Sequence, residues 1–375
     1  MQPMRPSNTA ADEPITAGPH AEPPLTGLRV VDLSQVLAGP YSAWALAQLG
    51  AEVTKVEPPG GDASMHVGPF HDGTSLYHRA VNTGKKVVNL DLTSVGDRER
   101  LHDMLGVADI LIQNMRAASA LKLSVSPPQL LERHPELVIV TISGFAAGSS
   151  EAGRAAYDLV IQALSGVMSL TGTPDRPAVR AGVPVSDLSA GLWAAIAGLA
   201  GLRYRDAHGR GGLLQVPMLD ASLSLLTYMG ADAATTGNSP GRIGNEHPSV
   251  VPYGSFEAKD GHVVVAVYSD KHWLPLCRAL GLGGLGADPE LAMMSGRVAR
   301  RVEVNLAVQA AISHHSRAEL LDLLESHDIP CAPVLELSEA LSTRYVKERR
   351  IISELDEDAA HYRTVSAPVK GIEHP

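Results

Sequence analysis

The residues most able to carry chemistry are two aspartates, each placed where a helix is expected to begin. Asp187 follows Ser186 and precedes a long Ala-rich helical pattern over 188–205, and Asp158 opens the helical pattern over 157–170. An Asp at a helix start is most often an N-cap, whose carboxylate accepts backbone N–H bonds. Capping therefore accounts for each aspartate taken alone. Two acids that cap neighbouring helices could nevertheless share one pocket.

Basic side chains gather along one edge of the strands that the sequence predicts. They fall at strand ends or in the loops just after them, where open α/β sheets bind ligands. In a chain with a formal net charge of −10, such clustering favours a small anionic ligand, whereas scattered solubilising charge is the alternative for any one residue. The residues are Lys55, Arg79, Lys85, Lys86, Arg116 and Lys122.

Three familiar kinds of site lack their sequence signatures. Glu57 ends the second predicted strand, as in dinucleotide-binding proteins, but the preceding turn SQVLAGPYSA has Gly39 alone in place of G-x-G-x-x-G. His314 and His315 are adjacent and not spaced along one helical face, so we expect no metal site. No G-x-S-x-G elbow follows a predicted strand, so a serine hydrolase has no support.

The elements that must position these residues alternate between strand and helix patterns. Strands are predicted at GLRVVDLS, AEVTKVE, KKVVNLDL, ADILIQN, ELVIVTISG and LLQVPM, and LDASLSLLTYMGADAAT reads as a helix. This alternation predicts an α/β fold with a parallel sheet covered by helices. From residue 253 a strand pair in YGSFEAKDGHVVVAVY and several short helices predict a smaller α+β domain. IPCAPVLE is expected to be a strand that returns to the large domain.

Composition limits the class of protein. A pI near 5.8 disfavours nucleic-acid binding, two cysteines are too few for a disulfide framework and fit a reducing cytoplasm, and no run is apolar enough for a membrane span. The Pro- and Ala-rich N-terminus lacks the pattern of a signal peptide. We expect a disordered tail over 1–24, a large Rossmann-like domain over 25–225, a small domain with linkers over 226–328, and a return to the large domain over 329–375.

Taken together, the motifs resemble the class III CoA-transferases (CaiB/BaiF type), which include formyl-CoA and carnitine CoA-transferases and α-methylacyl-CoA racemases. The matching segments, in family order, are PLTGLRVVDLSQVLAGPYSAWALAQLGAEVTKVEPPGGD, SLYHRAVNTGKKVVNLDL, ADILIQNMR, AAYDLVIQALSGVMSLTG, VPVSDLSAGL, GRGGLLQVPMLDA, GNEHPSVVPYGSFEAKDGHVVVAV and IPCAPVLE. The resemblance covers about residues 24 to 370. It implies an interlocked homodimer in which neither subunit closes its own core.

The resemblance also implies a reaction. It assigns the nucleophile to Asp187, which would attack an acyl-CoA thioester, form a mixed anhydride, and then carry CoA as an aspartyl thioester. Asp158 would support this chemistry in the pocket. Acyl-CoA and a carboxylic acid, one of the small dicarboxylic acids, are the expected substrates, with no metal and no permanently bound cofactor.

Two other functions stay open at this point. The racemase branch uses a His thirty residues before the matching Asp as its second base, and Tyr157 stands there in this chain. Because a neutral tyrosine is a poor base near pH 7, the pattern favours CoA transfer over racemisation, with Tyr157 as a pocket residue. The third possibility is a CoA-binding protein without transferase activity.

Further residues fall at positions where the family contacts CoA or the acceptor acid. The CoA positions are Leu37, Ala38, Lys55, Asn82, Lys85, Asn114, Met115 and Lys122, of which the lysines would pair with phosphates. His247 in GNEHPSVVPY would help to place the acceptor carboxylate. The glycine run that covers the site in some relatives is reduced here to Gly244 and Gly254, so loop gating is in doubt.

Overall fold

A computed structural model describes residues 23–357 and 360–369. The first 22 residues of the expected N-terminal tail lie outside the described residues. The described chain forms two compact units. Unit 1 takes its residues from Met1–Val167, Ala181–Asp232 and Thr343–Pro375, and unit 2 from Met168–Arg180 and Ala233–Ser342.

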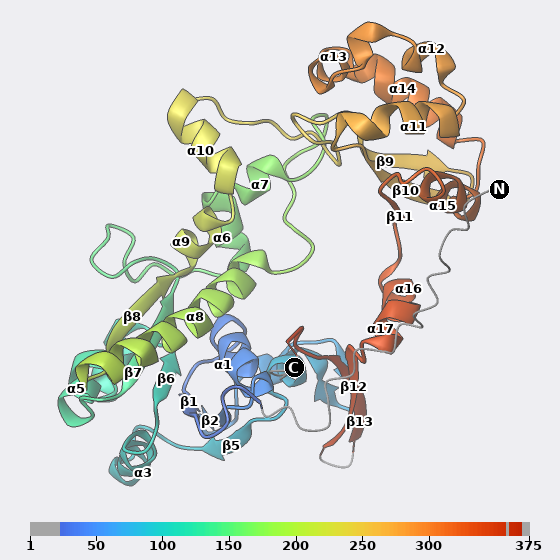
Figure 1. The fold of residues 1–375 in the computed structure, drawn as a ribbon. Helices are drawn as coiled ribbons and strands as arrows, with labels where there is room; N and C mark the ends of the chain where they lie inside the picture. The colour runs from blue at the N-terminus through green and yellow to red at the C-terminus, as the bar shows by residue number, and fades with distance from the viewer. Residues whose placement is uncertain (1–22, 358–359, 370–375) are drawn as a thin grey trace. The chain divides into compact units, whose positions relative to one another are not determined.

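Unit 1 is built on a six-stranded sheet in which every described pairing is parallel. The strand order is β5-β2-β1-β6-β7-β8, so the order reverses between β1 and β6 (Figure 1). Open sheets of this kind bind ligands at that reversal, beyond the carboxyl ends of the strands. The strands are β1 (Arg29–Asp32), β2 (Glu52–Glu57), β5 (Lys86–Asn89), β6 (Ile110–Gln113), β7 (Val138–Ser143) and β8 (Gly212–Pro217). The predicted α/β fold with a parallel sheet is confirmed.

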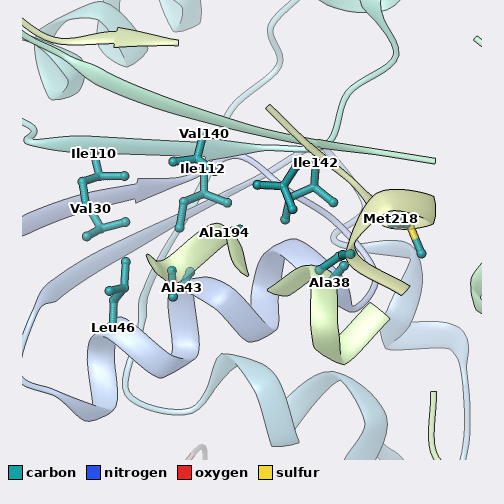
Figure 2. Close-up of a cluster of buried hydrophobic side chains, with 14 of the residues drawn as sticks. Val30, Ala38, Ala43, Leu46, Ile110, Ile112, Val140, Ile142, Ala194 and Met218 are labelled. Atoms are coloured by element: carbon teal, nitrogen blue, oxygen red, sulfur yellow. The ribbon is translucent and has the colours of Figure 1, made fainter. Parts of the chain in front are cut away.

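Both faces of this sheet are covered because alternate strand residues point to opposite sides. On one face, Val30 and Ile110 pack against α1 (Ala38–Gln48) and α8 (Val185–His208), as Figure 2 shows. On the other face, Val31, Leu111 and their neighbours pack against α3 (Val95–Leu105), α4 (Ala117–Lys122) and α5 (Pro127–Arg133). The sheet is therefore doubly wound, with the start of α8 and the start of α1 on the same face.

Small residues let α8 approach its neighbours closely. A Cβ added to Gly191 would lie 2.7 Å from the carbonyl oxygen of Ala38, and one added to Gly201 would lie 2.5 Å from Cγ1 of Val138. Both distances are too short for carbon, so larger residues would push α8 away from α1 and the sheet. By length and composition α8 could also cross a membrane, but buried core helices pass the same test.

Unit 1 contains further short elements. They are η1 (Ala63–His66), β3 (Phe70–His71), β4 (Thr74–Ser75), α2 (Leu76–Asn82), α6 (Asp158–Leu164), α9 (Met218–Ser224), α17 (Arg344–Glu348), β12 (Ile352–Glu357) and β13 (Ala360–Val365). The hairpin β12–β13 docks on α2 through buried Tyr362, whose hydroxyl lies 2.6 Å from that of Thr83. The hairpin β12–β13 is thus part of unit 1.

Two expected helices are interrupted. The pattern over 157–170 forms α6 and α7 (Val167–Leu170), which are separated at Gly166, where φ is +84°. The pattern after Pro217 forms α9 and α10 (Thr227–Thr236), with Thr227 in the left-handed region at φ +44°. Single residues with positive φ cannot continue a right-handed helix, so each pattern breaks there.

Unit 2 is a three-stranded antiparallel sheet, β11-β10-β9, packed against helices. The predicted hairpin is confirmed as β9 (Tyr253–Ala258) and β10 (Gly261–Ala266). The remaining elements are η2 (Asp270–His272), α11 (Trp273–Ala279), α12 (Gly283–Gly286), η3 (Pro289–Leu291), α13 (Met294–Ala299), α14 (Arg301–Ile312), α15 (Arg317–Glu325), β11 (Cys331–Pro333) and α16 (Leu337–Leu341).

The prediction that IPCAPVLE returns to the large domain is wrong. Its strand, β11, pairs with β10, with Cys331 opposite Val265. Ile329 and Cys331 belong to the apolar core of unit 2, so burial holds the segment there. The chain rejoins unit 1 only at Thr343.

Candidate active site

Asp187 lies in the first turn of α8 and does not cap it. The helix begins at Val185, two residues before the aspartate, and Pro184 stands at the N-cap position without a side-chain hydrogen bond. The expectation that Asp187 caps this helix is therefore wrong. Burial of the carboxyl group, together with the nearby charge of Asp158, raises the pKa of Asp187 to about 7.

Asp158 supplies the cap that α8 lacks. It is the first residue of α6, and one carboxylate oxygen accepts the backbone N–H of Ser186 at 2.9 Å. The other oxygen accepts from the side-chain amide of Gln162 at 2.7 Å. These bonds fix the carboxylate of Asp158 beside the first turn of α8. The two acids thus lie close enough for their charges to interact, and Asp158 is anchored by hydrogen bonds.

Tyr77, which no sequence pattern singles out, lies near these two acids. It lies on α2, and burial together with the charges of Asp187, Asp62 and Asp158 raises its pKa to about 12. The phenol therefore stays neutral and can donate a hydrogen bond near both acids. An aromatic residue in a short helix carries no signal of this role in the sequence. Tyr157, expected in the pocket, has a side chain that is 71% exposed.

Lys55 and Lys85 are buried in a network of ion pairs. The ammonium of Lys55 lies 2.8 Å from Asp62 and also donates to the backbone carbonyl of Ser34. Lys85 lies 2.8 Å from Asp32 and donates to two further oxygens of the chain. Both lysine side chains are fully buried. The expectation that they pair with phosphates is corrected, because their donors are directed to internal acceptors.

The charges in this network shift one another's pKa values. Burial alone would raise the pKa of Asp32, but the charges of Lys85 and Lys55 outweigh it and lower that pKa below its usual value. For Lys85, burial outweighs the attraction of Asp32 and lowers the pKa to about 8. The network therefore holds two carboxylates ionised in the interior.

The two asparagines expected at the CoA site also have internal partners. Asn82 is buried, donates to the backbone of His78 at 2.9 Å and accepts from Lys85 at 2.9 Å. Asn114 accepts from the backbone N–H of Gln35 at 3.0 Å and donates to its carbonyl at 2.8 Å. Both side chains therefore brace the loops around the carboxyl edge of the sheet.

Glu57, Asp62 and His78 bring potential metal-ligand atoms within 4.8 Å of one another. However, Lys55 already pairs with Asp62, and Nε2 of His78 lies 3.6 Å from Glu57. Nδ1 of His78 lies 2.9 Å from the hydroxyl of Ser64 and 3.2 Å from the side-chain amide of Asn82. Asp62 and His78 thus already have internal partners.

An apolar cavity of about 210 Å³ opens at the carboxyl ends of β1, β2, β5 and β6. Its walls come from Leu33, Gln35, Val56, Glu57, Pro58, Pro59, Leu90, Asp91, Leu92, Thr93, Met115 and Leu123. Lys122 is exposed beside Leu123, whereas Leu37 and Ala38 are buried at the start of α1. A flat apolar group could enter this cavity with an anionic group near Lys122.

His247 lies in unit 2 and has its own local partners. Its Nδ1 accepts the backbone N–H of Ser249 at 3.0 Å, and its ring meets that of Tyr253 edge-on at 5.4 Å. These contacts hold the imidazole against neighbouring residues of the same loop. An isolated antiparallel bridge between His247 and Val250 also joins the two sides of this loop.

Comparisons with known proteins identify the family of this chain. The family model described as CoA-transferase family III matches residues 25–375. Succinyl-CoA:mesaconate CoA-transferase of Haloarcula hispanica is 36% identical over 357 residues, covering 92% of this chain and 89% of that protein. Succinate–glutarate CoA-transferase of Agrobacterium fabrum is 32% identical over 364 residues, covering 95% and 91%. A CaiB/BaiF family protein from Brucella suis superimposes with a TM-score of 0.83 at 31% identity, covering 92% of each chain. The chain therefore belongs to CoA-transferase family III and is a CoA-transferase, and the resemblance seen in its sequence is confirmed.

Proposed function

We propose that this CoA-transferase works through covalent intermediates on Asp187. The observation that supports the proposal is a carboxylate in the first turn of α8, with a pKa near 7, beside the anchored carboxylate of Asp158 and the neutral phenol of Tyr77. A carboxylate that burial leaves poorly solvated is a stronger nucleophile than one in water. The phenol and the backbone N–H groups of the helix start can stabilise an oxyanion.

The reaction would proceed in four displacements. Asp187 attacks the thioester carbonyl of the donor and releases CoA thiolate, leaving a mixed anhydride. The thiolate then attacks the Asp187 carbonyl carbon, which gives an aspartyl-CoA thioester and frees the donor acid. The acceptor carboxylate attacks that thioester and again releases the thiolate. Attack of the thiolate on the acceptor carbonyl forms the new acyl-CoA and restores Asp187.

For the substrates, we propose succinyl-CoA as donor and a small dicarboxylic acid as acceptor. The relatives described above are named for succinyl-CoA or succinate paired with mesaconate or glutarate. CoA would use the 210 Å³ cavity beside Met115, with Lys122 near a phosphate and Leu37 and Ala38 at the start of α1. His247 would meet the second carboxylate of the acceptor.

The experiment that tests the function is a transfer assay with defined partners. Purified enzyme is incubated with succinyl-CoA and each of a series of acids, and the CoA thioesters are separated and identified by mass. The proposal expects new thioesters of small dicarboxylic acids, and few from monocarboxylic acids of equal length. Deuterium exchange at the α-carbon of a branched acyl-CoA, without transfer, would instead identify a racemase.

Activity should depend on pH through Asp187. Because burial and Asp158 raise the pKa of Asp187 to about 7, the nucleophilic carboxylate is lost as the pH falls through that value. We expect kcat/KM for succinyl-CoA to fall about tenfold per pH unit below 7 and to level off above 8. Steady-state rates from pH 5 to 9 measure this acidic limb of the pH profile, in which kcat/KM falls with pH. Asp158→Asn should move the limb to lower pH, whereas a flat wild-type profile down to pH 5 would contradict the assignment.

We further propose that the protein is an interlocked homodimer whose large domain corresponds to unit 1. Leu192, Trp193 and Ile196 of α8 are 48%, 47% and 52% exposed, so the helix keeps an apolar face that the described chain does not cover. Sedimentation equilibrium is expected to give twice the 39.5 kDa chain mass. A monomer at micromolar concentration would contradict this. The two free cysteines fit the proposed cytoplasmic location.

A further inference from the structure

The loop between β1 and α1 contains a residue in an unfavourable conformation. Val36 has φ +72°, in the left-handed region. A β-branched side chain rarely adopts that region, because its Cβ substituents crowd the backbone. Such a conformation persists only where the surrounding structure holds it, and it occurs most often at functional sites.

Asp62 holds Val36 in this conformation. The backbone N–H of Val36 donates to both carboxylate oxygens of Asp62, at 3.1 and 3.3 Å. The residues on either side are also fixed, since Gln35 bonds twice with Asn114 and the carbonyl of Ser34 accepts from Lys55. Three neighbouring residues of the loop are thus held from three other segments.

Asp62 is itself held rigidly and is shielded from solvent. Its side chain is fully buried, it pairs with Lys55 at 2.8 Å, and it accepts from the backbone and hydroxyl of Ser64 at 2.9 and 2.8 Å. The bond to the Ser64 backbone also caps η1. A carboxylate with so many internal donors has little capacity left for a substrate. Its effect on the reaction must therefore pass through the loop.

This loop leads directly into the residues assigned to CoA. Gln35 lines the 210 Å³ cavity, and α1 begins at Ala38 straight after Leu37. We propose that Asp62 is a positioning residue, which keeps Val36 left-handed and thereby presents Gln35 to Ala38 in the shape that binds CoA. The inference rests on the proposed function, because that function gives Leu37 and Ala38 to CoA.

The test separates the loop conformation from general stability. Asp62→Asn keeps the volume but removes the charge, so we expect the KM for succinyl-CoA and the Kd for CoA to rise about tenfold or more, with kcat changed less than about threefold. Glycine adopts positive φ without steric cost and so needs no support from Asp62 at position 36. Asp62→Asn with Val36→Gly should therefore recover most of the affinity lost in Asp62→Asn.

A second loop variant covers the case in which Asp62→Asn does not fold. Val36→Pro forbids positive φ and removes the N–H, yet leaves the pair of Asp62 with Lys55 in place. It should raise the Kd for CoA in the same way. Asp288→Asn is the matched control, because Asp288 caps η3 through Glu290 and pairs with an arginine in unit 2, and it should leave KM unchanged.

The outcomes distinguish the inference from the function on which it rests. If the wild-type enzyme transfers no CoA, the proposed function itself is contradicted, whatever the variants do. If the wild type is active, an unchanged Kd for CoA in both Asp62→Asn and Val36→Pro overturns the positioning role, as does a loss in Asp62→Asn that Val36→Gly fails to reverse. Calorimetric titration with CoA gives these Kd values without turnover.

Discussion

Replacing Asp187 by alanine is expected to abolish CoA transfer, with kcat reduced at least about 10³-fold. The reason is that every displacement in the proposed reaction forms or breaks a bond to this carboxylate, and the chain offers no second group at the same point of α8. Asp158 cannot replace it, because its oxygens accept from Ser186 and Gln162. Intact-protein mass spectrometry after incubation with succinyl-CoA should show a CoA-sized adduct on the wild type only. Hydroxylamine should convert that adduct to a hydroxamate.

A matched control exists in the same unit. Asp220 occupies the first turn of α9 as Asp187 does that of α8, but its side chain is exposed, so Asp220→Ala should retain full activity. A CoA adduct that persists in Asp187→Ala, or equal losses in both variants, would contradict the assignment.

A stability measurement tests whether misfolding could cause the lost activity. The native pKa of Asp187, about 7, lies above its ordinary value of 3.8, so the native state binds more protons between these pH values, and wild-type stability falls as the pH rises through that window. At pH 8 the ionised carboxylate destabilises the native state. Asp187→Asn should therefore raise the free energy of unfolding by about 4 kcal/mol at pH 8, and by much less near pH 4. Denaturant unfolding at the two pH values measures this difference.

Much of the fold could be predicted because its signals are local. Runs such as RVVD and ILIQ alternate between the two faces of one sheet, and their separation by helical patterns is enough to indicate parallel strands. The prediction failed where two alternatives have the same local pattern. IPCAPVLE reads as a strand in either unit, and only its pairing with β10 decides between them.

The candidate site shows the same limit. Asp187 and Asp158 could be selected because acids at helix starts have few roles, but which acid caps α8 depends on the packing of α6 against α8. Tyr77 could not be selected, because its role comes from burial beside acids that are distant in sequence. Lys55 and Lys85 were expected at strand ends or just after them, but Lys55 lies within β2 and Lys85 directly precedes β5. Their acidic partners follow from tertiary structure, which is why phosphates were expected instead.

Replacing Lys55 by methionine is expected to lower the free energy of unfolding by about 3–5 kcal/mol. The substitution leaves Asp62 buried without its counter-ion at 2.8 Å and weakens the compensation of Asp32, whose oxygen lies 3.9 Å from the same ammonium. An unpaired carboxylate in the interior costs far more than a lost surface pair. Thermal unfolding should show a decrease in Tm of about 10 °C.

Lys86→Met is the control for this prediction, because Lys86 is the next lysine along the chain from Lys85 and its side chain is exposed. It removes the same charge from the surface, where we expect a change within about 0.5 kcal/mol. A lysine that served chiefly to bind phosphate would behave in the opposite way, since its loss would weaken CoA binding and leave the apo-protein as stable as before. An unchanged Tm for Lys55→Met would therefore favour that role. A large decrease in the Tm of Lys55→Met without added CoA, together with an unchanged Tm for Lys86→Met, would show that the ion network stabilises the carboxyl edge of the sheet in the absence of substrate.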